Sequence, residues 1–209
     1  MLTRFQTQKL IRLFRLLDLT RDGHVEYEDF VEQARAVQRL NHWPDDHPHA
    51  HRLIWARRRM WGELQRRLDT NMDGEISLDE WLSFFTLVTD RSDGGELPEW
   101  VNHLIDPFFE SLDLDGDGVV TEQEYEFFCD TLGIREGARE LFRACVRGEE
   151  SLSRAMFGRL FAQWLLNRNP EEPGNYFLVG RFDYVSDEGL LERAAGEPEA
   201  PPEPVARAE

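Results

Sequence analysis

Four carboxylates in one twelve-residue stretch have the types and spacing of a calcium-binding loop. The stretch begins at Asp113 and ends at Glu124, with Asp115 and Asp117 at its third and fifth positions. Calcium takes about six to eight oxygen ligands, which carboxylates at positions 1, 3, 5 and 12 and the carbonyl of position 7 can supply together. Gly118 at position 6 permits the sharp turn because glycine reaches positive φ without strain. The alternative is a solvated acidic turn without metal.

The same pattern occurs twice more, in residues 18–29 and 69–80. Each loop has an apolar residue at position 8, which faces away from the metal, and an aromatic residue five positions later. Repetition at this level indicates one structural unit used several times, so all three loops are predicted to bind metal. The predicted ligands are Asp18, Thr20, Asp22, the His24 carbonyl and Asp29; Asp69, Asn71, Asp73, the Glu75 carbonyl and Glu80; and Asp113, Asp115, Asp117, the Val119 carbonyl and Glu124.

The first loop departs from the pattern at two ligand positions. Thr20 stands where a carboxylate or amide is usual, and Asp29 replaces the glutamate of position 12. Aspartate is one methylene shorter, so two oxygens reach the metal less easily. Lower coordination suits magnesium, which prefers six ligands at shorter distances. We therefore predict a mixed calcium/magnesium site here, against the alternative of a structural loop that stays empty.

A fourth repeat, in residues 145–156, keeps the scaffold but not the ligands. Leu152 takes position 8, whereas Cys145, Arg147 and Met156 take positions 1, 3 and 12. We expect this loop to bind no calcium and to pair with the third loop through an antiparallel bridge between Leu152 and Val120.

Apolar residues with helical periodicity flank every loop, which predicts an all-α fold of four helix–loop–helix units. The expected division is a first pair in residues 1–92, a second pair in 93–168, a closing segment in 169–185 and a disordered, acidic, proline-rich tail in 186–209. The predicted helices span residues 3–17, 26–40, 50–68, 78–89, 97–112, 122–131, 135–145 and 154–167.

Over residues 5–180 the chain resembles the EF-hand superfamily, and within it the sarcoplasmic calcium-binding proteins and the calerythrin-like bacterial proteins. The loop ending at Asp29, the segment Thr131–Ile134 and the segment Pro173–Phe177 carry the narrower resemblance. It implies a compact body of two packed EF-hand pairs, here with a degenerate fourth hand. It also implies calcium or magnesium binding and no catalysis.

The composition of the chain limits the classes of binding partner that we expect. The net charge of −17 argues against nucleic acid or an anionic membrane as the main partner. No apolar run is long enough for a membrane helix, and the N-terminus lacks the features of a signal peptide, so we expect a cytoplasmic protein, as a monomer. Cys129 and Cys145 lack metal-like spacing and are predicted to be reduced thiols in the core.

Two other motifs could have a separate function, but we favour a purely structural interpretation of each. His42, His47, His49 and His51 could hold a transition metal, but a polar connector containing histidines is the simpler interpretation. The arginine-rich stretch at residues 57–67 could serve a partner or a membrane. We expect it to be the helix entering the second loop, with its arginines balancing an acidic body.

Three functions are consistent with the predicted loops. A calcium buffer or calcium-responsive modulator is favoured. A sensor that exposes a groove for a protein partner is the second, although such grooves are usually rich in methionine and only four are present. The third is a carrier of a small apolar ligand, because the resemblance extends to coelenterazine-binding proteins. No nucleophile–base pattern or phosphate loop predicts an enzyme.

Overall fold

The computed structural model describes residues 1–92, 96–134, 137–169 and 171–181. Three predictions lie partly or wholly outside these ranges: the boundary between the two pairs at residues 92/93, the first two residues of the helix expected at 135–145, and the acidic tail in 186–209. The division at residues 92/93 and the tail therefore stay predictions. None of the helices in the described part is long and apolar enough to cross a membrane.

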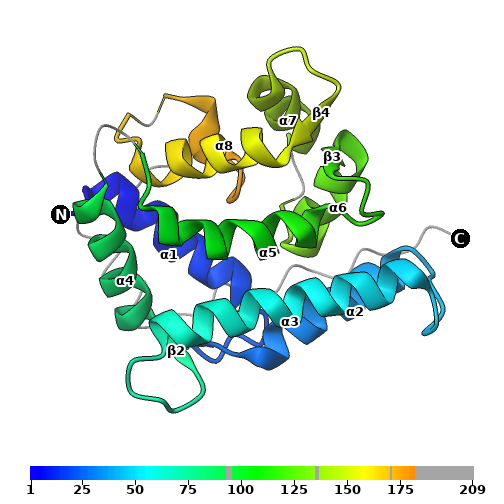
Figure 1. Cartoon of the computed structure of the whole chain (residues 1–209), viewed down its shortest axis with the longest axis horizontal. Helices are drawn as coiled ribbons and strands as arrows, with labels where there is room; N and C mark the ends of the chain where they lie inside the picture. The colour runs from blue at the N-terminus through cyan, green and yellow to red at the C-terminus, as the bar shows by residue number, and fades with distance from the viewer. Residues whose placement is uncertain (93–95, 135–136, 170, 182–209) are drawn as a thin grey trace, which may run out of the picture.

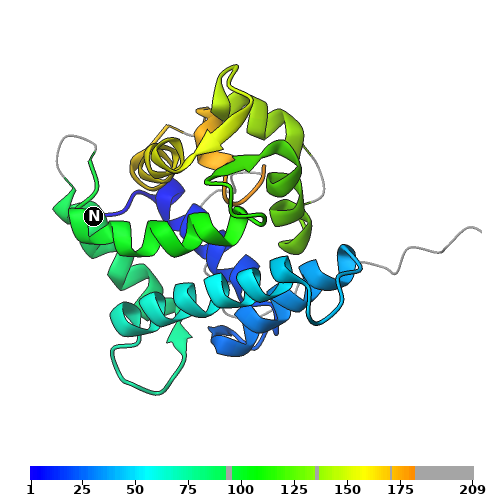
Figure 2. The same cartoon turned by 45° about the vertical axis from the view of Figure 1, so that its right-hand side comes forward.

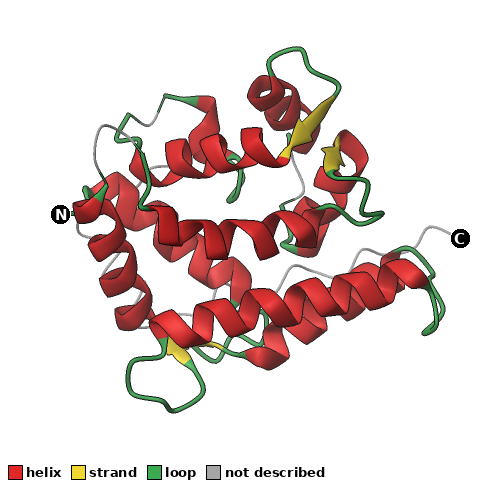
Figure 3. Ribbon diagram, in the orientation of Figure 1, coloured by secondary structure: helices red, strands yellow, loops and turns green. Residues whose placement is uncertain are grey.

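Eight α-helices and four very short strands build the described part of the chain (Figures 1 and 3). They follow one another as helix, loop and helix four times, as the periodicity predicts. The elements are α1 (Arg4–Leu17), β1 (His24–Val25), α2 (Tyr27–Leu40), α3 (Pro48–Leu68), β2 (Ile76–Ser77), α4 (Leu78–Arg91), the 3₁₀ turn η1 (Glu99–Val101), α5 (Asn102–Leu112), β3 (Val119–Thr121), α6 (Glu122–Thr131), α7 (Ala138–Val146), β4 (Ser151–Ser153), α8 (Arg154–Leu166) and the 3₁₀ turn η2 (Pro173–Tyr176).

The strands join the four units into two pairs. Strand β1 runs antiparallel to β2 with Val25 opposite Ile76, and β3 runs antiparallel to β4 with Val120 opposite Leu152. All four of these position-8 side chains are fully buried. The predicted bridge between Val120 and Leu152 is confirmed, and the loop without ligands pairs with the third loop in the predicted register.

Three helix starts differ from the prediction by two residues or more, and each has a local cause. The expected helix at residues 97–112 begins only at Asn102, because the chain first forms the η1 turn after Pro98. Helix α7 begins at Ala138 after Gly137, whose φ of +76° is left-handed and breaks the helical path. Helix α3 begins at Pro48, two residues before the predicted start at residue 50, because proline is tolerated in the first turn of a helix.

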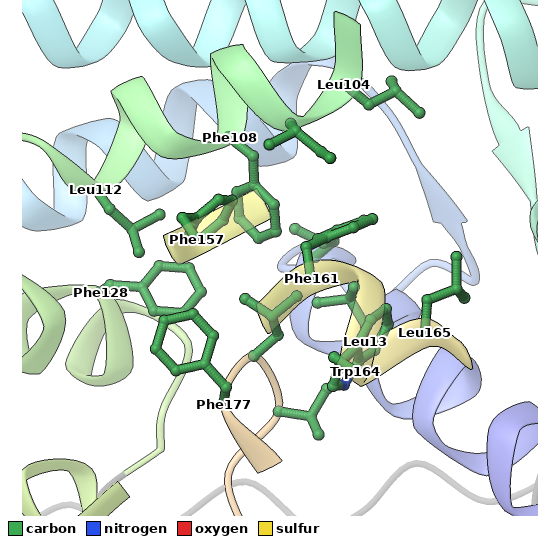
Figure 4. Close-up of a cluster of buried hydrophobic side chains, with 14 of the residues drawn as sticks. Leu13, Leu104, Phe108, Leu112, Phe128, Phe157, Phe161, Trp164, Leu165 and Phe177 are labelled. Carbon is green, nitrogen blue, oxygen red and sulfur yellow. The ribbon is translucent and has the colours of Figure 1, made fainter. Parts of the chain in front are cut away.

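The centre of the molecule is filled by aromatic side chains (Figure 4). Phe108 of α5 makes edge-to-face contacts with Phe157 and Phe161 of α8 at centroid distances of 5.6 and 6.3 Å. Trp164 and Phe177 extend this cluster and are fully buried. The prediction that the phenylalanine and tryptophan stripes form the core is confirmed for these residues. Both cysteines are free and buried, also as predicted.

The N-terminal helix is fastened to the C-terminal segment by the one lysine of the chain. The ammonium of Lys9 donates to the carbonyl oxygens of Trp164 and Asn167 and to Oδ1 of Asn175, the last at 2.8 Å. These acceptors lie at the end of α8 and in η2. The same closing segment is held elsewhere by Tyr125, whose hydroxyl donates to the carbonyl of Phe177 at 2.6 Å. Buried polar contacts therefore join helix α1 and helix α6 to the closing segment.

Helix α3 is the longest helix and packs against both α2 and α5 (Figures 1 and 2). Most of its arginines pair with acids, as expected: Arg59 with Glu110, and Arg66 with Glu63. For Arg57 the prediction is wrong. This arginine is 2% exposed, and its Nε and Nη1 have no hydrogen-bond partner among the described residues, so it does not balance surface acids. Its helical position, one turn after Leu53, places it on the core face.

Candidate metal-binding loops

The second and third loops are wound by the same set of backbone hydrogen bonds. In each, the N–H of position 6 donates to the position-1 carboxylate, that of position 5 to the position-3 side chain, and that of position 7 to the position-5 carboxylate. All six distances lie between 2.9 and 3.2 Å. The glycines at position 6, Gly74 and Gly118, have φ of +90° and +91°, which explains why glycine is needed there.

The glutamates at position 12 close these two loops. Glu80 and Glu124 each form a capping box with the hydroxyl residue at position 9, Ser77 or Thr121, at the start of the outgoing helix. The other oxygen of each carboxylate accepts the N–H of position 2 at 2.8 Å, across the loop. Burial raises the pKa of Glu80, but hydrogen bonds from Ser77 and Thr70 outweigh it and lower this pKa to about 2. The carboxylate is therefore ionised, as a metal ligand must be.

The third loop gathers its carboxylates most closely. One oxygen from each of Asp113, Asp115 and Asp117 lies within 4.8 Å of the other two. Asp113 is 3% exposed and Glu124 is 8% exposed, whereas the other two aspartates lie toward solvent. A buried carboxylate beside two further carboxylates fits a hard divalent cation, which would neutralise their mutual repulsion.

The second loop also fits a cation, on a different observation. Oδ1 of Asp69 is buried and has no hydrogen-bond partner among the described residues, while Oδ2 of the same carboxylate accepts the Gly74 N–H. A buried carboxylate oxygen without a donor is costly unless a cation or water reaches it. The amide of Asn71 donates to Asp73 at 2.7 Å, so positions 3 and 5 already lie in contact.

The first loop shows the consequences of its two substitutions. Asp18 accepts the N–H of Gly23 at 3.0 Å, as position 1 does in the other loops. The shorter Asp29 is fully buried, and the N–H that it accepts across the loop comes from position 3, Thr20, at 2.9 Å instead of from position 2. Its second oxygen accepts the Glu26 N–H. Burial raises the pKa of Asp18, and the nearby acids Asp29 and Asp22 raise it further against the backbone hydrogen bonds.

The fourth loop is wound differently, besides lacking ligands. In the other three loops the left-handed residues are those at positions 4 and 6, for example Met72 and Gly74. In the fourth they are at positions 3 and 4, Arg147 and Gly148, with φ of +53° and +95°. Cys145 at position 1 is buried, and burial raises its pKa to about 11, so it is a neutral thiol rather than a thiolate ligand.

The histidines of the connector make ring and hydrogen-bond contacts with their neighbours. Within the described part of the chain, the three aspartates of the third loop are the group of three or more metal-ligating side chains brought together. The ring of His47 stacks on Trp43 at a centroid distance of 5.0 Å, and the ring of His49 lies tilted to Trp43 at 5.4 Å. His49 also makes a hydrogen bond of 2.8 Å, through Nδ1, to the carbonyl of Leu114. The preferred interpretation as a polar connector fits these contacts.

Comparison with known proteins agrees with this geometry. A family model described as EF hand matches residues 10–32, 66–85 and 104–128, and each segment contains one of the three predicted loops. The sarcoplasmic calcium-binding proteins I, III and IV of Branchiostoma lanceolatum are 30% identical over 128 residues, which cover 60% of this chain and 69% of those proteins. The chain belongs to the sarcoplasmic calcium-binding protein group of the EF-hand family.

Solved structures share the fold. A sarcoplasmic calcium-binding protein from amphioxus has a TM-score of 0.63 at 22% identity, covering 87% of this chain and 100% of that chain. The coelenterazine-binding protein of Renilla muelleri, in its calcium-loaded apo form, has a TM-score of 0.66 at 17% identity with the same coverage. At these identities the likeness concerns the fold. The predicted all-α, EF-hand architecture is thereby confirmed.

Proposed function

We propose that this protein binds calcium through residues 18–29, 69–80 and 113–124 and acts as a calcium buffer or calcium-responsive modulator. The observation that carries the proposal is the common winding of the loops, in which a position-1 aspartate accepts the position-6 glycine N–H. In the second and third loops the position-12 glutamate also closes across the loop. The ligands are those expected from the sequence, and the name of the related Branchiostoma proteins supports calcium as the ion.

A buffering role is favoured over a sensor with a methionine-lined groove. Met1 and Met72 are exposed and far apart in the chain, Met60 is buried, and Met156 is half-buried against the core. Flexible methionine surfaces are the usual basis of promiscuous helix binding. A carrier of an apolar ligand is also less favoured, because aromatic side chains from α5 and α8 pack on one another at the centre of the molecule (Figure 4).

The first loop is proposed to be the mixed calcium/magnesium site. Asp29 is short and buried, and the hydroxyl of Thr20 contacts Asp18 at 3.4 Å. A ligand set with a neutral hydroxyl and a short position-12 carboxylate favours six-coordination. We also include in the proposal a monomeric, cytoplasmic protein without catalytic activity and without nucleic-acid or membrane partners. The net charge of −17 supports the part on nucleic-acid and membrane partners, and the two free, buried thiols support the cytoplasmic location.

Calcium should also stabilise the fold. Ten of the predicted ligands are carboxylates, and gathering them without metal costs electrostatic free energy. A ligand that binds only the folded state raises the free energy of unfolding by mass action. We expect a large rise in melting temperature between excess chelator and excess calcium. Equal melting temperatures in the two conditions would contradict the proposal.

The decisive experiment is isothermal titration of chelator-stripped protein with calcium, with and without millimolar magnesium. Three equivalents, one of them displaced by magnesium, are expected. Two equivalents would leave the first loop structural, like the fourth. No binding would overturn the proposed function and make the acidic loops scaffold only.

A further inference from the structure

The third loop differs from the second in being docked against another part of the molecule. Leu114, at position 2, is 7% exposed and packs with Ala34, Val37 and Leu53 of helices α2 and α3. The equivalent residue of the second loop, Thr70, is exposed. The loop with the most complete ligand pattern is therefore also the one in contact with the first half of the chain.

The first turns of α3 add polar contacts to this docking. His49 bonds to the Leu114 carbonyl, and Arg52 donates from Nε to the Asp113 carbonyl at 3.3 Å. The same guanidinium lies with Nη2 3.5 Å from Oδ2 of Asp113. Asp113 is the position-1 ligand of the loop, and its side chain is only 4% exposed. A permanent cation thus contacts a carboxylate that calcium would use.

Position 4 of the third loop makes room for this cation. The first and second loops carry Arg21 and Met72 there, in the left-handed conformation with φ of +63° and +60°. The third loop carries Gly116, with φ of +80°. A Cβ built on Gly116 would overlap the guanidinium of Arg52. Glycine at this position is not needed for the loop conformation, since two side chains adopt it elsewhere. It is needed for Arg52 to approach.

The other two loops have no such cation. Asp18 accepts the backbone N–H groups of Arg21 and Gly23 and the hydroxyl of Thr20, and Asp69 accepts the N–H of Gly74. No arginine forms an ion pair with either aspartate within the described part of the chain. The contact with Arg52 is therefore a property of the third loop.

We propose that Arg52 is a resident counter-cation that lowers the calcium affinity of the third loop and is displaced from Asp113 when calcium binds. A guanidinium and a calcium ion compete for the same carboxylate and repel each other at this distance. Displacement would release the first turns of α3, so occupancy of the third loop is communicated to the α2–α3 pair. The proposal rests on the proposed function, because it takes the third loop to be a calcium site.

The test reads each loop separately by ¹H–¹⁵N NMR during a calcium titration. The amides of Gly23, Gly74 and Gly118 each donate to the position-1 carboxylate of their own loop, so each reports its own site. Arg52→Gln removes the charge and keeps most of the length of the side chain. It is expected to raise the third-loop affinity roughly 2- to 5-fold, the size expected of one partly exposed ion pair. The affinities read at Gly23 and Gly74 should stay unchanged.

A second variant removes the contact while keeping the arginine. Gly116→Met copies position 4 of the second loop and expels the guanidinium, so it should also raise the third-loop affinity. In the Arg52→Gln background the same substitution should give no further gain, which separates expulsion of Arg52 from any strain in the loop. Arg35→Gln is the matched control, because Arg35 is an exposed arginine paired with Glu32 on α2. It should leave all three affinities unchanged.

The outcomes distinguish this proposal from the proposed function. Unchanged or weaker third-loop binding in Arg52→Gln, with the other loops binding normally, would overturn the role of Arg52 alone. An equal gain in Arg35→Gln would overturn it too, because the effect would then follow net charge. No chelator-reversible shift at any of the three glycine amides of the unmodified protein would overturn the calcium function itself.

Discussion

The first and second EF-hand pairs close in the same way but carry different chemistry. In the first, two acidic loops face each other across Val25 and Ile76. In the second, one acidic loop faces a loop without ligands across Val120 and Leu152. All four side chains are fully buried. The comparison teaches that pairing depends on apolar contacts at position 8, and that a hand can lose its ligands and its winding without losing its structural role.

The largest expected effect is the loss of one binding site per position-12 substitution. Glu80→Gln should leave the second pair intact, whereas Glu124→Gln should leave that pair with no calcium site. We expect the affinity of the mutated loop to fall more than about 100-fold, since outer-shell partners alone are worth 10- to 100-fold. Calorimetry should show one equivalent fewer for each variant. An unchanged stoichiometry for Glu124→Gln would remove the proposed difference between the pairs.

The next largest effect concerns the hand without ligands. Leu152→Ala should lower the free energy of unfolding by about 2–5 kcal/mol, as for other buried large-to-small substitutions. Ile76→Ala, the matched change in the first pair, should cost a similar amount, because both residues are fully buried at position 8. Urea unfolding in excess calcium measures both. A cost below about 1 kcal/mol for Leu152→Ala alone would show that the fourth hand does not support the third.

Features that recur in every helix–loop–helix unit can be predicted from the sequence. Contacts made by a single residue in one unit are predicted less well. Ligand spacing, helix positions and the Val120–Leu152 bridge follow from a pattern that recurs in every unit. The approach of Arg52 to Asp113 joins residues 61 positions apart, and its only sequence signal is glycine at position 4 of one loop. Arg57 is the first of three consecutive arginines, and its place one turn after Leu53 is the sequence signal that it faces the core, unlike the exposed Arg58 and Arg59.

A third prediction concerns the buried guanidinium of Arg57. Helix α3 of the first pair buries this charge, whereas the core of the second pair is aromatic. Burial lowers the pKa of Arg57 to about 10, and its Nε and Nη1 lack partners among the described residues. The core between α5 and α8 is built instead of aromatic rings. Replacing buried charges by apolar residues of similar volume is often stabilising by about 1–4 kcal/mol.

Arg57→Met is therefore expected to raise the melting temperature in both chelator and calcium. Arg58→Met is the matched control: Arg58 is exposed and bonds only to the Tyr27 hydroxyl in the described part. Its effect should stay within about 0.5 kcal/mol, as for most surface substitutions. A lower melting temperature for Arg57→Met would show that the guanidinium has an acceptor in solution and contributes to the fold.

The smallest expected effect concerns Lys9, which joins helix α1 to the end of α8 and to η2. Burial lowers the pKa of Lys9 from 10.5 to about 7, although the amine contacts three oxygen acceptors. A pKa that is lower in the folded state means that the unfolded chain binds more protons between about pH 7 and 10.5. The free energy of unfolding therefore rises with pH in this window, and the stability gained is lost again as pH falls toward 7.

Between pH 7 and 8.5 the gain should be about 1.5 kcal/mol, since the unfolded chain binds on average about 0.8 proton more than the folded protein in this window. Lys9→Met should lack this slope, whatever its absolute stability. Because the chain has a single lysine, NMR of protein labelled with ¹³C in lysine shows its titration as one Cε signal without altering the ammonium. A Lys9 pKa near 10, with equal slopes in the two proteins, would mean that the carbonyl acceptors at the end of α8 fully offset burial of the ammonium.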